Sequence, residues 1–166
     1  MKHIKDYQKF LNENYVSGNK VSGLVYHASG FPIENLKKDP MWFALEKVHS
    51  DKGWFSNLID DGSDEAYQYQ AKINGKIADL GDPAVEKLFN DIGVDPMDYE
   101  TEILGNPTAK EVMSLKGTKA LIKAGYDGLV YYDYDPRDFQ SDLEALIVFN
   151  PAKTVKNWKL SKQYPI

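Results

Sequence analysis

Hydrophobic positions along the first third of the chain follow helical and strand spacings in turn. Apolar residues recur every three or four positions over 3–16 and predict a helix. The β-rich run VSGLVYHAS (21–29) predicts a strand that ends at His27, where small residues and a glycine follow. The short apolar run MWFAL (41–45) predicts a second strand, and the pattern after it predicts a helix over 46–58.

The middle of the chain carries turn and capping signals. The run EAYQYQAKINGKIADL (65–80) predicts either one bent strand or a hairpin, because an Asn-Gly pair lies inside it. A proline at the start and a glycine beyond the end predict a helix over 83–92. Thr108 and Glu111 have the spacing of a capping box and predict a helix that runs to about Ala124.

The last third predicts two strands, 127–134 and 143–149, joined by the acidic loop DPRDFQSD (135–142). With the elements before them, these strands predict an α+β fold whose strand-rich core spans about 21–160. The chain has 166 residues and shows no internal repeat or linker. It is therefore predicted to form a single domain over 1–166.

Composition and charge narrow the function classes. The net charge is −5 and Arg137 is the only arginine, so the chain is poorly suited to hold a phosphate backbone. We expect any macromolecular partner to be a protein rather than a nucleic acid. The absence of cysteine excludes disulfides, thiolate zinc sites and a cysteine nucleophile. No secretory leader and no membrane-length apolar run are found, so we expect a cytoplasmic protein without a membrane partner.

The acidic residues near the predicted loop do not form a convincing calcium site. Asp133, Asp135 and Glu144 fit positions 1, 3 and 12 of a calcium-binding loop. Arg137 and Asp138, however, stand where that loop needs an oxygen ligand and a glycine. A solvated loop is the better interpretation.

The three histidines show no paired metal-ligand spacing, and we expect no metal. His3 and His49 lie in polar, helix-like surroundings and are predicted to be surface residues. His27 differs because it ends an apolar strand. Taken alone, a histidine at a strand end is usually a structural hydrogen-bonding residue.

Four motifs occur in an informative order: VYHAS (25–29), MWFALEKVHSDKGWF (41–55), AGYDGLVYYD (124–133) and LEALIVFNPAKTVKNW (143–158). In this order they resemble the ADP-ribosyltransferase fold. The similarity is to its His-Tyr-Glu branch, which includes diphtheria toxin and the poly(ADP-ribose) polymerases, and within it to small bacterial and phage members. The resemblance spans roughly residues 23–158 and implies a split β-sheet core with flanking helices.

The resemblance also implies a site for NAD. His27 matches the family histidine that holds the adenosine-side ribose, and Glu144 matches the catalytic glutamate. Trp42 stands where the family usually has a tyrosine, and an indole can stack on nicotinamide in its place. These three are the predicted catalytic residues. The other predicted NAD-binding residues are Ala28, Ser29, Phe43, Ala44 and Trp54.

The second aromatic wall of this site has two candidate positions. In the preferred alignment Trp54 forms it, because residues 46–58 are then left for a helix. In an alternative alignment the stretch GWFSN (53–57) is the strand, and Tyr67 or Tyr69 supplies the wall.

The chemistry implied by the resemblance suits these residue types. Cleavage of the nicotinamide–ribose bond passes through an oxocarbenium-like centre, which a carboxylate beside the ribose stabilises. Two aromatic walls orient the nicotinamide, and a neutral imidazole can hydrogen-bond a ribose hydroxyl. Asp142 and Arg137 are candidate residues for contacting the acceptor.

The resemblance therefore implies an NAD-dependent ADP-ribosyltransferase, a glycosyltransferase that uses NAD as co-substrate and modifies a macromolecular acceptor. A bacterial toxin or a phage effector that modifies its host is the implied setting. Two alternatives stay open: a non-catalytic module of the same fold that binds NAD, ADP-ribose or a protein, and an NAD glycohydrolase.

Overall fold

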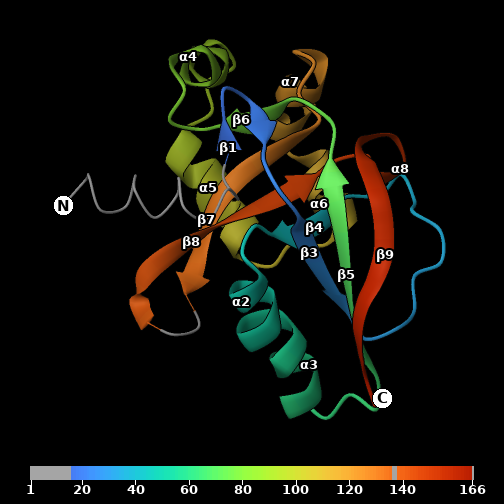
Figure 1. The fold of residues 1–166 in the computed structure, drawn as a ribbon. Coiled ribbons are helices and arrows are strands. Elements are labelled where there is room, and N and C mark those ends of the chain that lie inside the picture. The colour runs from blue at the N-terminus through green and yellow to red at the C-terminus, as the bar shows by residue number, and fades with distance from the viewer. Residues whose placement is uncertain (1–15, 136–137, 166) are drawn as a thin grey trace.

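The computed structural model describes residues 16–135 and 138–165, which form a mixed α+β structure (Figure 1). Its strands are β1 (Val16–Ser17), β2 (Lys20–Val21), β3 (Val25–Ser29), β4 (Met41–Ala44), β5 (Ala66–Ile73), β6 (Ile77–Asp79), β7 (Gly128–Asp135), β8 (Asp138–Val148) and β9 (Val155–Tyr164). Its helices are α2 (Lys47–His49), the π-helix η1 (Ser50–Phe55), α3 (Ser56–Asp60), α4 (Pro83–Asp91), α5 (Pro96–Leu104), α6 (Ala109–Ser114), α7 (Lys116–Lys123) and α8 (Pro151–Thr154). The predicted α+β class is confirmed.

A seven-stranded sheet in the order β6-β7-β8-β4-β3-β5-β9 forms the centre of the molecule. All neighbouring strands are antiparallel except β6 and β7, which are parallel. The strands β1 and β2 form a separate small hairpin. Figure 1 shows α4 and α7 at one end of the sheet and α2 and α3 at the other.

The sheet must curl, because β5 and β6 are consecutive in the chain but far apart in strand order. Ile73 ends β5 and Ile77 begins β6. The four residue steps between them span about 14 Å when fully extended. Five strand spacings in a flat sheet would need about 24 Å. The half formed by β3, β5 and β9 is therefore folded toward the half formed by β6, β7, β8 and β4.

Two hydrophobic clusters pack against the sheet. The first lies between the β6–β4 half and the helices α4 to α7, and its members include Val85, Phe89, Tyr99, Ile103, Val112, Leu121, Leu129, Tyr131, Ala145 and Ile147. The second joins the two halves, and its members are Val25, Phe43, Leu45, Ala71, Ile73, Ile77, Val130, Leu146, Val148 and Val155. Alternate residues of β8 belong to different clusters, as the period of two in a strand requires.

The two halves meet at a narrow seam between β3 and β4. Only the pair Tyr26 and Ala44 is in register across it, whereas β3 matches β5 over all five of its residues. Beyond that pair a side chain replaces the backbone ladder: Nδ1 of His27 lies 2.7 Å from the carbonyl oxygen of Trp42. The seam is thus open at the residues where the sequence predicts a site.

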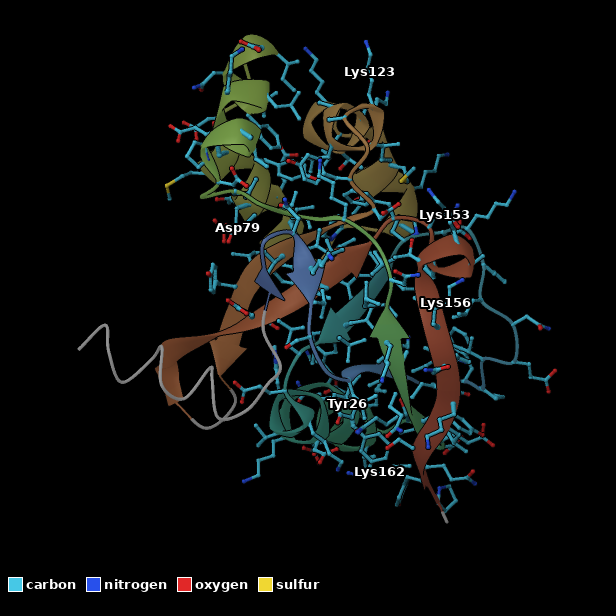
Figure 2. The ribbon with its side chains drawn as sticks, turned by 45° about the horizontal axis from the view of Figure 1, so that its top comes forward. Tyr26, Asp79, Lys123, Lys153, Lys156 and Lys162 are labelled. Atoms are coloured by element: carbon cyan, nitrogen blue, oxygen red, sulfur yellow. The ribbon has the colours of Figure 1, made fainter. Side chains whose placement is uncertain are left out.

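The free edge of the folded-over half is β9, which is rich in exposed lysine. Figure 2 shows Lys156 and Lys162 along this edge and Lys153 in the helix α8 that precedes it, whereas Asp79 lies on β6 at the opposite edge of the sheet. Lysine on an exposed edge strand disfavours pairing with the strands of other molecules. None of the helices in the described part of the chain has the length and apolarity that a bilayer crossing requires.

The structure confirms several local predictions. The strand at 41–45 and the helix over 83–92 are present, and 46–58 is helical. The capping box is complete, because the Thr108 side chain accepts from the backbone of Glu111 and the Glu111 side chain accepts from the backbone of Thr108. The predicted helix over 3–16 lies outside the described residues, except for its last residue, which begins β1.

Neither prediction for residues 65–80 is correct. The stretch forms β5 and β6, but they belong to opposite halves of the sheet and do not pair. Gly75 lies in the crossing between them, where a Cβ atom would come within 2.8 Å of both Thr154 and Asp127 side chains. The glycine is needed here for close approach between segments rather than for a hairpin turn.

Two further predictions are corrected. The predicted loop 135–142 is strand wherever it is described, because β7 and β8 pair as far as Asp135 and Asp138, and residues 136–137 lie outside the described residues. Backbone hydrogen bonds extend an antiparallel ladder whatever the polarity of the side chains. The helix predicted from 108 to 124 is interrupted at Leu115, whose backbone is extended. The elements α5, α8 and β9 had no counterpart in the prediction.

Candidate functional site

A cavity of about 390 Å³ opens beside the seam, between the sheet, the η1–α3 helical segment and the residues after α5. Its lining combines aromatic, apolar and a few polar side chains, which is typical of small-molecule sites. The lining residues are His27, Ala28, Trp42, Trp54, Leu58, Ile103, Leu104, Asn106, Pro107, Tyr131 and Asp133. Four of the predicted NAD-binding residues are therefore found together.

His27 is held in one protonation state by its neighbours. A carbonyl oxygen can only accept, so the contact with Trp42 requires a proton on Nδ1 of His27. Burial lowers the pKa of His27 below its usual 6.5, and the bond to the Trp42 carbonyl opposes this only in part. The ring is neutral near pH 7, which leaves Nε2 as a hydrogen-bond acceptor. Such an atom can accept from a hydroxyl group.

Trp42 and Ala28 come from the two strands that border the seam. Trp42 is paired with Ile147 of β8 and packs partly against the first hydrophobic cluster. Ala28 is paired with Gln68 of β5 and also lines the cavity. Residues of both strands thus border the same space.

Trp54 reaches the cavity from η1, and a carboxylate fixes its ring. Nε1 of Trp54 donates to Oδ2 of Asp133 at 3.3 Å. Nε2 of His49 lies 3.0 Å from the same oxygen. The rings of His49 and Trp54 have their centres 5.0 Å apart. The cluster of His49, Trp54 and Asp133 joins the helix to β7 across the cavity.

The prediction that His49 is a surface residue is wrong, since it is only 1% exposed. The polar residues around it in the sequence misled the prediction, because a helix buries one face only. Tyr131 and Asp133 were also missed as cavity residues. Their two-residue spacing on a strand was the available signal that they share a face.

Tyr131 presents a neutral phenol to the cavity. Burial, with a further contribution from the charge of Asp133, raises the pKa of Tyr131 well above that of an exposed tyrosine. The hydroxyl therefore keeps its proton at physiological pH. It can act as a donor or an acceptor but not as a phenolate.

Several predicted site residues lie away from the cavity lining. Phe43 and Ala44 are fully buried in the sheet. Ser29 is also buried, and its hydroxyl bonds both the backbone N–H and the carbonyl of Phe31. These three residues shape the strands around the cavity rather than line it.

Glu144 is half-buried on β8, directly opposite Tyr132 of β7. It is in phase with Leu146 and Val148, whose side chains belong to the second cluster. Tyr131, in contrast, belongs to the first cluster. Glu144 is not among the residues that line the cavity, and the carboxylate that lines it is that of Asp133.

The alternative alignment requires a strand at 53–57, and this stretch is helical. Tyr69 stacks on Trp158 with ring centres 4.3 Å apart, and its hydroxyl accepts from the backbone N–H of Ile33. Neither Tyr67 nor Tyr69 lines the cavity.

Only one of the two candidate acceptor residues is among the described residues. Asp142 is paired with Tyr134 in the β7–β8 ladder. Arg137 lies outside the described residues. Within 16–135 and 138–165, no group of three or more histidine and acidic side chains is arranged to hold a metal ion.

Comparisons of the chain with protein-family models, with curated proteins and with solved structures gave no match. The function must therefore be inferred from the chemistry of the site itself.

Proposed function

We propose that the aromatic cavity binds NAD and that the protein is an NAD-dependent ADP-ribosyltransferase. One observation carries the proposal: His27, Ala28, Trp42 and Trp54, which come from three separate segments, line one cavity. Their chemistry suits a nicotinamide riboside. The two indoles offer flat walls, the peptide of Ala28 offers a donor and an acceptor for a carboxamide, and neutral His27 accepts from a ribose hydroxyl.

The sheet also supports the proposed fold. Its two halves curl toward each other and are joined by a single register pair between β3 and β4. This arrangement agrees with the split sheet that the sequence resemblance implies. The resemblance further suggests a bacterial toxin or phage effector that acts in a bacterial cytoplasm on a protein acceptor.

In this proposal Glu144 is the catalytic carboxylate. The nicotinamide occupies the cavity, and its ribose reaches past the end of β4 to the other face of the sheet, on which Glu144 lies. The bond between the nicotinamide nitrogen and C1′ of the ribose breaks, and its electron pair leaves with the nicotinamide. The carboxylate stabilises the positive charge that develops on the ribose, and a nucleophile of the acceptor then bonds to C1′ and loses its proton.

A second candidate is a binding module of the same fold that does not cleave NAD. The observation that favours it is the position of Glu144, which is absent from the cavity lining. A third outcome, NAD hydrolysis with water as acceptor, would use the same residues.

The test is the release of nicotinamide from NAD by purified protein, with and without bacterial lysate, together with NAD binding by calorimetry. We expect release that rises with lysate. Glu144→Gln should slow it by about 100-fold or more, because the carboxylate acts mainly in the transition state, while NAD binding changes little. Glu100→Gln, an acid far along the chain on α5, is the control and should keep full activity.

Other results of this test would identify one of the alternative functions. Release that does not depend on lysate identifies a glycohydrolase. Binding without release identifies the binding module. Absence of both binding and release refutes the proposal.

A further inference from the structure

We propose that Asp133 is a positioning residue of the NAD site, which fixes the indole of Trp54 as one wall of the aromatic cavity. This inference rests on the proposed function, because the wall matters only if the cavity takes a flat ring such as nicotinamide. The role of Asp133 follows from its bonds within the cluster of His49, Trp54 and Asp133.

One carboxylate oxygen serves two donors. Oδ2 of Asp133 lies 3.0 Å from Nε2 of His49 and 3.3 Å from Nε1 of Trp54. A carboxylate only accepts, so Nε2 of His49 and Nε1 of Trp54 both donate to it. These bonds join residues 84 and 79 positions apart in the chain. They therefore fix the helix relative to the strand, which local bonds within the helix cannot do.

The π-helix makes this shared contact possible. His49 and Trp54 are five residues apart. In an α-helix their directions would differ by about 140°. The i to i+5 bonding of a π-helix brings residues five apart onto nearly the same face. Ser50 to Phe55 adopt this form, and both rings point toward Asp133 as a result.

Burial gives the bonds their strength. His49 is 1% exposed and the Asp133 side chain is 26% exposed. Hydrogen bonds to a charged acceptor in such surroundings are worth more than neutral ones at the surface. Rotation of the Trp54 ring would cost one such bond. The indole is thus held in place before any ligand arrives, and a ligand pays less ordering entropy on binding.

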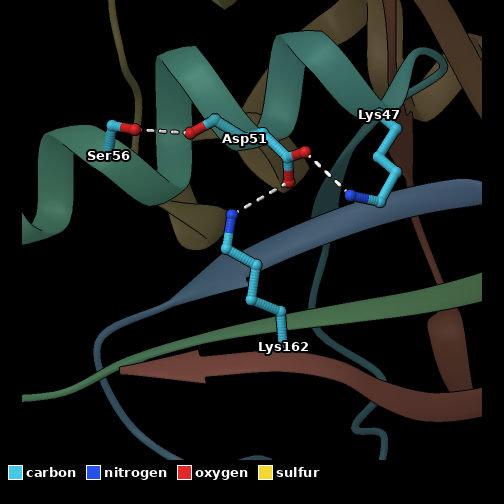
Figure 3. Close-up of polar contacts among 4 residues, drawn as sticks. All are labelled: Lys47, Asp51, Ser56 and Lys162. Atoms are coloured by element: carbon cyan, nitrogen blue, oxygen red, sulfur yellow. Dashed lines mark hydrogen bonds and ion pairs between the residues drawn. The ribbon is translucent and has the colours of Figure 1, made fainter. Parts of the chain in front are cut away.

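A carboxylate on the helix itself, that of Asp51, provides a matched control. Asp51 bonds Lys47 at 2.8 Å and Lys162 of β9 at 3.4 Å, as Figure 3 shows. Its side chain is 24% exposed, close to the value for Asp133. Asp51 therefore also ties η1 to a strand, but it does not line the cavity.

The first test needs no ligand. The indole N–H groups of the tryptophans each give a signal in a nitrogen–proton NMR spectrum, and Trp54→Phe identifies the signal of Trp54. Asp133→Asn should shift that signal and speed its exchange with water, whereas Asp51→Asn should leave it unchanged. An unchanged Trp54 signal in Asp133→Asn overturns the proposal.

The second test measures NAD binding in a double-mutant cycle. Asp133→Asn and Trp54→Phe should each weaken NAD binding, Asp133→Asn by about tenfold, which is the scale of one charge-assisted bond. If Asp133 acts through Trp54, the double variant should be little weaker than Trp54→Phe alone. Asp51→Asn should stay within about twofold of wild type.

If the losses of NAD affinity in the two single variants multiply in the double variant, Asp133 acts independently of Trp54. That result would show that Asp133 contacts the ligand itself and would overturn the positioning role. If wild-type protein neither binds nor cleaves NAD, the proposed function fails and the role in NAD binding fails with it. The NMR signal separately decides whether Asp133 fixes the ring, so the two failures are distinguishable. Thermal unfolding of every variant excludes a folding defect as the cause.

Discussion

Two cavities lined by described residues differ in size and chemistry, and the larger of them has the poorer chemistry for a dinucleotide. The larger, about 560 Å³, lies near the β1–β2 turn and β6 and is lined by acidic residues such as Asp79, Asp82 and Glu100. The smaller, the aromatic cavity of about 390 Å³, has aromatic walls and a neutral histidine. NAD carries two phosphates, and like charges repel by about 1 kcal/mol at 4 Å even in water.

The polar groups of the two cavities also differ in what they bond. Asp79 accepts from the backbone of Gly81, and Asp82 caps α4 by accepting from Ala84. These carboxylates have local structural roles. In the aromatic cavity, His27 and Asp133 bond residues 15 to 84 positions away. Long-range bonds that fix side chains around a cavity are the better indication of a functional site than the volume of the cavity.

Removing an aromatic wall should give the largest effect on ligand binding. Trp54→Ala takes away a stacking surface worth about 1–3 kcal/mol per ring, so NAD binding should weaken by about 10- to 100-fold in calorimetry. Glu100→Gln in the acidic cavity should leave NAD binding within about twofold of wild type. If Glu100→Gln weakens NAD binding more than Trp54→Ala does, the acidic cavity and not the aromatic cavity is the NAD site.

A tightly packed glycine behind the aromatic cavity should be important for the stability of the protein. A Cβ atom at Gly117 of α7 would meet Phe89, and it would lie 2.8 Å from the ring of Tyr99 on α5. Gly117→Ala should therefore lower the free energy of unfolding by about 2 kcal/mol and Tm by about 4–8 °C. Ile103 and Leu104 of α5 line the cavity, so NAD binding should weaken as well.

The control lies at the other cavity. At Gly81 a Cβ atom would approach only the Asp79 carboxylate, at 3.4 Å. Gly81→Ala should change Tm by about 1 °C or less. Equal losses of Tm in the two variants would mean that the helices behind the aromatic cavity are not tightly packed.

The sequence could predict local structure where the cause is local. The helix starts predicted from the Thr108–Glu111 capping box and from the proline of α4 are confirmed. They could be predicted because cap geometry depends on a few neighbouring residues. The crossing at Gly75 could not be predicted, because the segments that crowd it come from distant parts of the chain. Strand pairing between opposite halves leaves no local signal.

The same division holds for the site. His27 and Trp42 could be named from motifs, since each lies in a distinctive short run. The importance of Asp133 and His49 could not, because it arises from a bond between β7 and α2 across 84 residues. The π-helix that lets Trp54 share this bond also depends on tertiary contacts, since its sequence, SDKGWF, carries no pattern of its own.

The smallest expected effect is the pH dependence of NAD binding, which comes from His27. In the folded protein burial lowers the pKa of His27, while in the unfolded chain it titrates near 6.5. Between the two pKa values the unfolded chain binds more protons, so stability rises with pH there. The contribution of His27 to stability is fully present above about pH 6.5 and is lost as pH falls through the lowered pKa.

Ligand binding should follow the same direction for a separate reason. Protonation converts Nε2 of His27 from an acceptor into a donor and breaks a bond from a ribose hydroxyl, worth about 1 kcal/mol or about fivefold in affinity. NAD affinity should therefore be constant above about pH 6.5 and decline as the pH falls through the lowered pKa of His27 in the folded protein. His27→Gln, which does not titrate, should bind more weakly and show a flatter profile. An unchanged decline in His27→Gln would assign the pH dependence to another group and remove His27 from the binding role, while Glu100→Gln, altered only in the acidic cavity, should retain the wild-type profile.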